Sequence, residues 1–314
     1  MTFFIFRRLA NFIITIFVVS IIVFAAMNVL PGDPALTILG LDATEDALDS
    51  LRDKLGLNQP LLNRYFLWVG NALQGNFGIS HSFSVPVSEL ITERLPLTVS
   101  LAISGMICTI ILAFFLGVFA AANHKRSGDW GVMIISQLGI AVPAFWLSIL
   151  LVLLFAVKLR WLPPGGFPGW ENPLEAIRSL IMPTLALTLV QSAVLARVTR
   201  SSMLEVMRQD YIRTAQASGF NSRRILWLHT LPNALIPIIT IIGMQFAALV
   251  TGTIVIENVF YLPGLGKLIF QSISNRDLPT VQALVMLFAA IVIIANFIVD
   301  IAYSLIDPRL KERT

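Results

Sequence analysis

The chain has 314 residues, of which 56% are hydrophobic and 13% are charged, and its mean hydropathy is +0.81. Soluble domains carry about 25% charged residues. Because the apolar residues also fall in long blocks, these values exclude an ordinary soluble protein and indicate an all-α membrane protein. The net charge of +4 does not point to nucleic acid, since the basic residues lie in short loops between apolar stretches.

Six apolar stretches, none containing Lys, Arg, Asp or Glu, predict six transmembrane helices. They cover residues 9–30, 97–122, 131–157, 179–196, 234–256 and 278–299. The first follows Arg7 and Arg8 and is longer than the apolar region of a cleaved signal peptide, so we expect it to be retained. The fourth is the shortest and contains Pro183, and its sequence is compatible with a helix that continues past Arg197.

The distribution of Lys and Arg predicts that both chain ends are cytoplasmic. With the N-terminus inside, the inner segments hold the majority of the 22 Lys and Arg residues. The predicted organisation is then a first transmembrane helix (1–30), an extracytoplasmic segment (31–96), a five-helix core (97–306) and a cytoplasmic tail (307–314). Within the core, residues 197–233 form a cytoplasmic loop.

The extracytoplasmic segment 31–96 is acidic. Leucines at positions 48, 51, 55 and 57, with charges between them, predict one amphipathic helix there. A group of carboxylates precedes or accompanies this helix: Asp42, Glu45, Asp46 and Asp49.

Residues 210–224 form a polar, arginine-rich loop between two apolar spans. Asp210 is a good N-cap for a short helix, and Gly219 suits the left-handed position that ends it. Asn221 or Ser222 then caps a second helix through Leu228, and prolines 232 and 237 favour a bent re-entry into the membrane. Either a partner protein docks here or the helix lies on anionic lipid. The glycine break favours docking, because lipid binding does not require it.

Little else in the sequence indicates chemistry. It lacks the motifs of nucleotide sites and metalloproteases, its three histidines have no metal-ligand spacing, and we predict neither catalysis nor a bound metal. Residues 263–267 are interpreted as a turn before the sixth helix. Cys108, the only cysteine, is expected to be a buried inert thiol.

Two acids lie close to predicted spans. Glu257, next to Asn258, either lines a pathway or marks the membrane boundary. Asp300 has either a structural or a coupling role.

The loop also resembles a known motif. Arg213-Thr214-Ala215, Gly219 and Leu231-Pro232 stand at the spacing of the EAA loop of binding-protein-dependent ABC importer permeases. Arg-Thr replaces the Glu-Ala start, as is common in the peptide and nickel branch, and His229 replaces an isoleucine. Further stretches resemble that branch in order: 30–35, 55–61, 77–80, 94–98, 143–147, 161–163, 203–206, 233–237, 257–260, 263–266, 276–279 and 307–309.

The resemblance implies the fold of a type I ABC importer permease in the bacterial inner membrane. It also implies transport of di- or oligopeptides, with opines, glutathione or chelated nickel as alternatives within the branch. The implied partners are a second permease subunit, an extracytoplasmic solute-binding protein and two ATPase subunits that hold ATP and Mg. A secondary transporter is the alternative of another class, but it requires a charge relay that these spans nearly lack.

The resemblance assigns ATPase coupling to the cytoplasmic loop, at Asp210, Tyr211, Arg213, Thr214, Ala215, Ala217, Gly219, Arg223 and Arg224. Glu257, Asn258 and Asp300 are candidates for the pathway or its gate. The acidic group at Asp42, Glu45, Asp46 and Asp49 is the candidate contact for the binding protein, and a structural cap over the bundle is the alternative role of segment 31–96.

Overall fold

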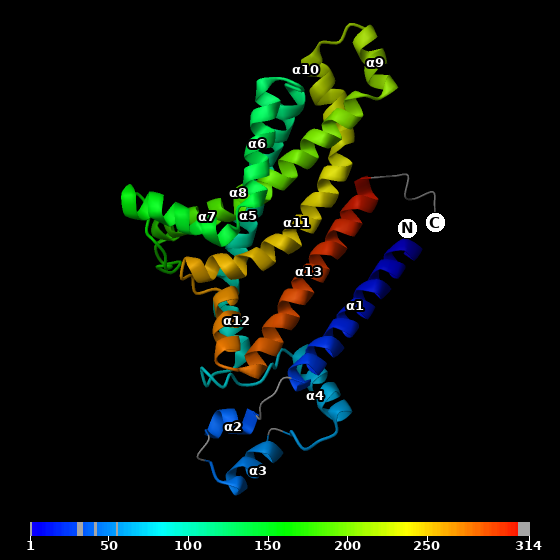
Figure 1. The fold of residues 1–314 in the computed structure, drawn as a ribbon. Coiled ribbons are helices and arrows are strands. Elements are labelled where there is room, and N and C mark those ends of the chain that lie inside the picture. Colours follow the sequence, from blue (N-terminus) through cyan, green and yellow to red (C-terminus); the bar gives the residue numbers. More distant parts are fainter. Residues whose placement is uncertain (1, 30–33, 41–42, 55, 307–314) are drawn as a thin grey trace.

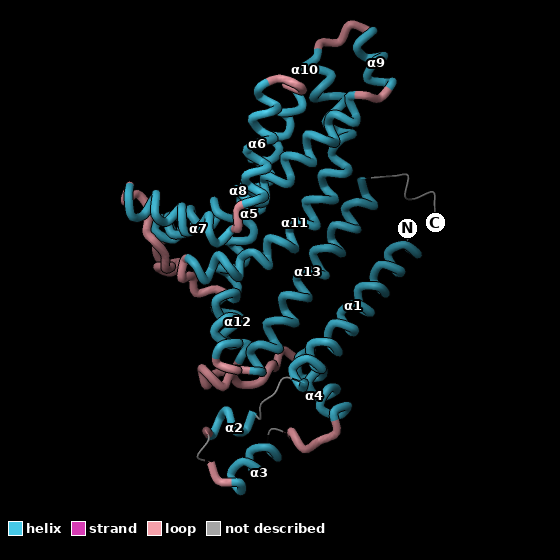
Figure 2. The backbone as a smooth tube through the Cα atoms, viewed as in Figure 1, coloured by secondary structure: helices cyan, strands magenta, loops and turns pink. Residues whose placement is uncertain are grey.

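The computed structural model describes residues 2–29, 34–40, 43–54 and 56–306. In this part of the chain the backbone forms helices and loops (Figure 2). It also contains one isolated bridge, between Ile79 and Pro86. The helices are α1 (Thr2–Val29), α2 (Pro34–Leu39), α3 (Glu45–Lys54), α4 (Leu61–Leu73), α5 (Val87–Ala122), α6 (Ser127–Ala141), α7 (Ala144–Leu151), α8 (Pro173–Met207), α9 (Asp210–Ala217), α10 (Ser222–Arg224), α11 (Leu231–Val259), α12 (Leu265–Ser274) and α13 (Leu278–Ile306). Two π-helical stretches, η1 (Val152–Lys158) and η2 (Ile225–Thr230), continue α7 and lead into α11.

Within the described residues, five helices are long and apolar enough to cross a membrane, and a bent pair makes a sixth candidate span. The bent pair corrects the third predicted stretch, which breaks into Ser127–Ala141 and Ala144–Lys158 at an angle of 103°. Pro143 explains the break. Its ring disfavours helical geometry at Val142, which is extended at φ −88° and ψ 122°.

The second span begins earlier than predicted. Helix α5 starts at Val87 and contains Pro96, so the end of segment 31–96 is helical. Residues 87–96 were not included in the predicted apolar stretch because positions 89, 93 and 94 are charged, but α5 runs through them. Helix α8 likewise runs past Arg197 to Met207 and contains Pro183.

The core of the bundle consists of α5, α8 and α11. Helix α5 lies against α8 over much of its length, and small residues permit the close approach. At Gly117 an added Cβ would lie 2.5 Å from the Cβ of Thr199 and 2.8 Å from the Ala196 carbonyl oxygen. Helix α1 lies outside this core and packs on α13, with the rings of Phe12 and Phe297 5.3 Å apart.

The molecule has two distinct ends, separated by the length of the spans (Figure 1). Helices α9 and α10 lie at one end, whereas α2, α3, α4 and α12 lie at the other. The described part of segment 31–96 contains three helices before α5, where the sequence analysis predicted one. Leu48 of α3 is buried, Leu57 follows the helix, and Leu55 and Asp42 lie outside the described residues. Residues 263–267 lead into α12, a helix that hydropathy alone missed.

Cys108 is exposed in the isolated chain, which corrects the expectation of a buried thiol. It follows Ile107, which is 53% exposed. An apolar span presents such residues to lipid, so an apolar sequence context did not imply burial inside the protein.

Candidate functional site

The candidate site is residues 208–230, here called the elbow. Its first helix, α9, begins one residue earlier than an Asp210 cap would require, because the extended Gln209 occupies the N-cap position. Asp210 is the first helical residue, where its charge complements the helix dipole. Its backbone carbonyl accepts a hydrogen bond of 3.1 Å from the Thr214 hydroxyl, and its carboxylate lies 3.4 Å from Arg213.

Gly219 ends α9 as predicted, with φ at +84°. The amide of Gly219 donates to the Gln216 carbonyl at 3.0 Å, and that of Phe220 donates to the Ala215 carbonyl at 3.3 Å. A Cβ at Gly219 would meet nothing within 4 Å, so the backbone conformation and not space calls for glycine.

Asn221 is the N-cap of the second helix: its side-chain oxygen accepts a hydrogen bond of 2.8 Å from the Arg224 amide. The prediction left Asn221 and Ser222 open, and the structure selects Asn221. The second helix does not end near Leu228. It continues through η2 into α11, so that Ser222–Val259 forms one helical stretch. Pro232 falls in the first turn of α11, directly after the wider π-helical turns of η2.

The two halves of the elbow are packed together. Ile212, Ala215 and Ile225 form a small buried cluster between α9 and the second helix. On the surface, the Arg224 guanidinium lies 4.4 Å from the centre of the Phe220 ring, which stacks on His229 with centroids 5.6 Å apart. These contacts hold the turn at Gly219 in one arrangement.

The outward face of the elbow carries aromatic and basic side chains. Tyr211 is 46% exposed, and the side chain of Arg213 is 73% exposed. Thr214, Ala217, Arg223 and Arg224 are also exposed, whereas Ala215 is buried. Tyrosine and arginine are enriched in protein interfaces, so this composition suits protein docking.

An ion cluster that the sequence analysis missed lies at the base of the bundle near the elbow. Asp129 at the start of α6 is buried, and its carboxylate accepts hydrogen bonds from Arg200 of α8, one of them 2.7 Å long. The Lys125 amide donates to it at 3.1 Å, and the His124 ring lies at 3.2 Å. This cluster fixes the turn between α5 and α6 to α8.

Glu257 and Asn258 lie at the opposite end. Glu257 is completely buried and accepts hydrogen bonds from the Thr98 hydroxyl at 2.6 Å and the Gly266 amide at 2.6 Å. Asn258 donates to the Gly266 carbonyl at 3.2 Å. In this conformation Glu257 therefore faces α12 and not an open pathway. Asp300 falls in α13, and its side chain lies outside the described part.

A second junction at that end was also missed. Asp277, completely buried, accepts hydrogen bonds from the hydroxyl of Ser80, from the His81 amide at 3.1 Å and from the Thr280 hydroxyl at 2.8 Å. It fixes the loop before α5 to the start of α13. By contrast, Glu45, Asp46 and Asp49 are exposed on α3, where Asp49 pairs with Arg52 at 2.7 Å.

A helical bundle of continuous and broken apolar spans, with a packed polar elbow at one end, is the architecture of a multi-pass membrane protein. The chain belongs to the family of binding-protein-dependent transport system inner membrane components. The family profile matches residues 113–312, and the profile of the family's N-terminal part matches residues 1–102. The protein is therefore a multi-pass component of the inner membrane.

Curated relatives match over nearly the whole chain. A peptide transport system permease of Brucella abortus (strain 2308) is 43% identical over 312 residues, covering 99% of both chains. A peptide ABC transporter permease of Sinorhizobium fredii is 39% identical, covering 98% of this chain and 99% of its own. The glutathione transport system permease GsiC of Escherichia coli K12 is 39% identical over 305 residues, covering 97% of each.

Among solved structures, the inward-facing MetNI methionine ABC transporter matches with a TM-score of 0.58 and 17% sequence identity. The match covers 69% of this chain and 96% of the matched one. This confirms the fold of a type I ABC importer permease.

Proposed function

We propose that this chain imports di- or oligopeptides as one of two permease subunits in an ATP-driven transporter. The proposal rests on relatives of nearly full length whose names specify peptide or glutathione transport. Glutathione is itself a tripeptide and is the second candidate substrate. The observation that carries the mechanism is the packed elbow, with Tyr211 and Arg213 on its exposed face.

In the proposed assembly the elbow and both chain ends are cytoplasmic, and helices α2–α4 and α12 are extracytoplasmic. Two ATPase subunits hold ATP and Mg, because this chain carries no nucleotide motif. One of them grips the elbow, and a solute-binding protein delivers the peptide at the other end. ATP favours the closed ATPase pair, and this preference shifts the two permease subunits from inward-facing to outward-facing.

Replacing Tyr211 by alanine tests the docking role. Tyr211 is exposed, so its removal leaves the buried cluster of the elbow intact while deleting an aromatic contact available to a partner. We expect the ATPase subunits to dissociate during purification and peptide uptake into proteoliposomes to fall by at least about tenfold, the effect of roughly 1.4 kcal/mol of lost contact.

The matched control is Tyr261→Ala, since Tyr261 is 72% exposed at the opposite end. It should leave both readouts unchanged. A double variant, Tyr211→Ala with Arg213→Glu, removes both exposed contacts. If it keeps its ATPase subunits and transports normally, the elbow is not the coupling site.

A further inference from the structure

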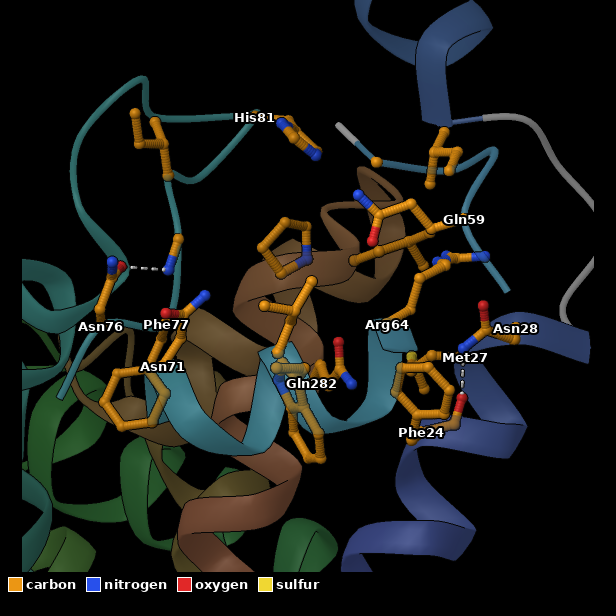
Figure 3. Close-up of a pocket in the computed structure, with 18 of the residues that line it drawn as sticks. Phe24, Met27, Asn28, Gln59, Arg64, Asn71, Asn76, Phe77, His81 and Gln282 are labelled. Carbon is orange, nitrogen blue, oxygen red and sulfur yellow. Dashed lines mark hydrogen bonds between the residues drawn. The ribbon is translucent and has the colours of Figure 1, made fainter. Parts of the chain in front are cut away.

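A cavity of about 860 Å³ lies at the end opposite the elbow (Figure 3). Its walls come from the last turns of α1, from α4, from the loop around residues 76–81 and from the first turns of α13. The loop between α3 and α4 contributes Gln59. The volume falls within the range of about 300–1,000 Å³ typical of small-molecule sites.

Helix α4 sets the surroundings of the cavity. Leu62, Phe66 and Leu73 lie on one face of the helix and are 70%, 64% and 84% exposed. Arg64 and Asn71, seven residues apart and so nearly two turns, lie on the opposite face and line the cavity. An amphipathic helix of this kind lies along the membrane surface with its apolar face toward lipid. The cavity therefore belongs to the aqueous side of α4.

Arg64 is a half-buried cation without a counterion in the described structure. Its guanidinium makes no ion pair or side-chain hydrogen bond there. Arg52, by contrast, also lines the cavity but pairs with Asp49 at 2.7 Å. The remaining candidate cation is His81, whose imidazole pKa is lowered by burial, with Asp277 opposing the shift in part. Asp53 also lines the cavity and accepts a hydrogen bond of 2.6 Å from Asn58, so Arg64 is the arginine of the cavity that has no acid within ion-pair distance in the described structure.

Three amide side chains face the same space: Gln59, Asn71 and Gln282. None of them makes a side-chain hydrogen bond within the described residues. Phe24 of α1 and Trp68 of α4 complete the lining with aromatic surface. Unused amide donors and acceptors beside one cation and aromatic rings match a peptide: its backbone, one carboxylate and an apolar side chain.

We propose that this cavity binds short peptides before they enter the membrane pathway, with the peptide carboxylate on Arg64 and the peptide backbone on the three amides. This deepens the proposed function and rests on it. A single free arginine suits a carboxylate better than a phosphate, because a doubly charged group calls for more cations or converging backbone amides. The ligand is a free peptide and not a loop of the binding protein, because a cavity of this volume suits a small molecule.

The test measures binding of the tripeptide Ala-Ala-Phe to the complete transporter in lipid nanodiscs, without binding protein or nucleotide, by calorimetry. The same peptide with an amidated C-terminus is the second probe. We expect amidation to weaken binding about tenfold, as the loss of one charged hydrogen bond predicts. Arg64→Gln should weaken the free acid to the same degree and should make binding insensitive to amidation. Arg160→Gln, at an exposed arginine outside the cavity, should change neither.

The proposal is overturned if Arg64→Gln and the unmodified chain bind both probes equally. It is also overturned if Arg64→Gln weakens docking of the binding protein while the unmodified transporter binds no peptide. The comparison of the free and amidated peptides needs no variant. If Arg64→Gln does not assemble, equal binding of the two peptides to the unmodified transporter overturns the proposal. Uptake into proteoliposomes separates failure of the proposed binding site from failure of the proposed transport function. If peptide is taken up and Arg64→Gln changes neither binding nor uptake, this site alone is refuted. If peptide binds but is not taken up, the proposed transport function is refuted.

Discussion

The hydroxyl of Thr98 donates a hydrogen bond of 2.6 Å to Glu257, joining α5 to α11 across 159 residues of sequence. The same carboxylate accepts the Gly266 and Lys267 amides at the start of α12, and Thr98 accepts the Leu265 amide at 2.9 Å. One buried acid therefore holds three helices together at the end opposite the elbow.

Glu257→Ala should destabilise the protein by at least about 1–3 kcal/mol, because buried donors on Thr98 and Gly266 lose their acceptor. Thermal unfolding in detergent measures the effect. Glu205→Ala, at an exposed position on α8, is the control and should change little. Equal melting temperatures for the two variants would contradict a structural role for Glu257.

Asp129→Asn should destabilise the protein by about 3 kcal/mol, because it leaves Arg200 without its charged partner in a largely buried place. Glu175→Gln breaks the ion pair with Arg178. The side chains of Glu175 and Arg178 are 43% and 46% exposed, so this substitution should lower the free energy of unfolding by only about 0–1 kcal/mol. Urea titration of the purified chain compares the two, and a smaller effect at Asp129 than at Glu175 would refute this assignment.

Gly219→Val should disturb the elbow, because a β-branched residue at φ +84° carries a backbone strain of about 1–2 kcal/mol. Gly219→Asn is the matched control, since asparagine tolerates the left-handed conformation. Limited proteolysis at the elbow and peptide uptake measure the outcome. We expect faster cleavage and slower uptake for valine only, and equal behaviour of the two variants would show that the conformation of Gly219 is not required.

Acidification should weaken the junction at His81. Burial lowers the pKa of this imidazole below its ordinary value near 6.5, and Asp277 opposes the shift in part. Near that pH the unfolded chain binds more protons than the folded chain, so His81 contributes stability that is present above about pH 6.5 and lost as the pH falls.

The melting temperature should therefore drop when the pH is lowered from about 7.5 to about 5.5, and His81→Gln should reduce the drop. A pH dependence that this substitution leaves unchanged would assign the effect to other groups.

The helix end and the helix cap in the elbow could be predicted from the sequence because they depend on local residue chemistry. A glycine after a short polar helix and an asparagine two residues later each have one favoured backbone role, and Gly219 and Asn221 adopt those roles. The spans were readable for the same reason, since twenty apolar residues are a local property. The start of α5 and the break at Pro143 were not, because hydropathy measures solubility in lipid and does not register where a helix starts or bends.

The polar junctions escaped prediction because their partners are distant in sequence. Asp277 and Ser80 are 197 residues apart, and Asp129 and Arg200 are 71 apart. In the sequence, an acid at the edge of a span that faces water cannot be distinguished from one that accepts a hydrogen bond from a buried hydroxyl. The packing of the helices determines which of the two environments the acid has. The cavity at Arg64 is similar, since residues 24–28, 52–81 and 278–282 have to meet before its walls exist.

The helical stretch Ser222–Val259 begins in the elbow and ends at the buried carboxylate of Glu257. At about 1.5 Å per residue its 38 residues are roughly 57 Å long. No loop interrupts this stretch, so the proposed ATPase contact and the carboxylate that anchors α12 lie at the two ends of one continuous helical element. In the proposed assembly, this element is the covalent path from the elbow to the end that carries α12.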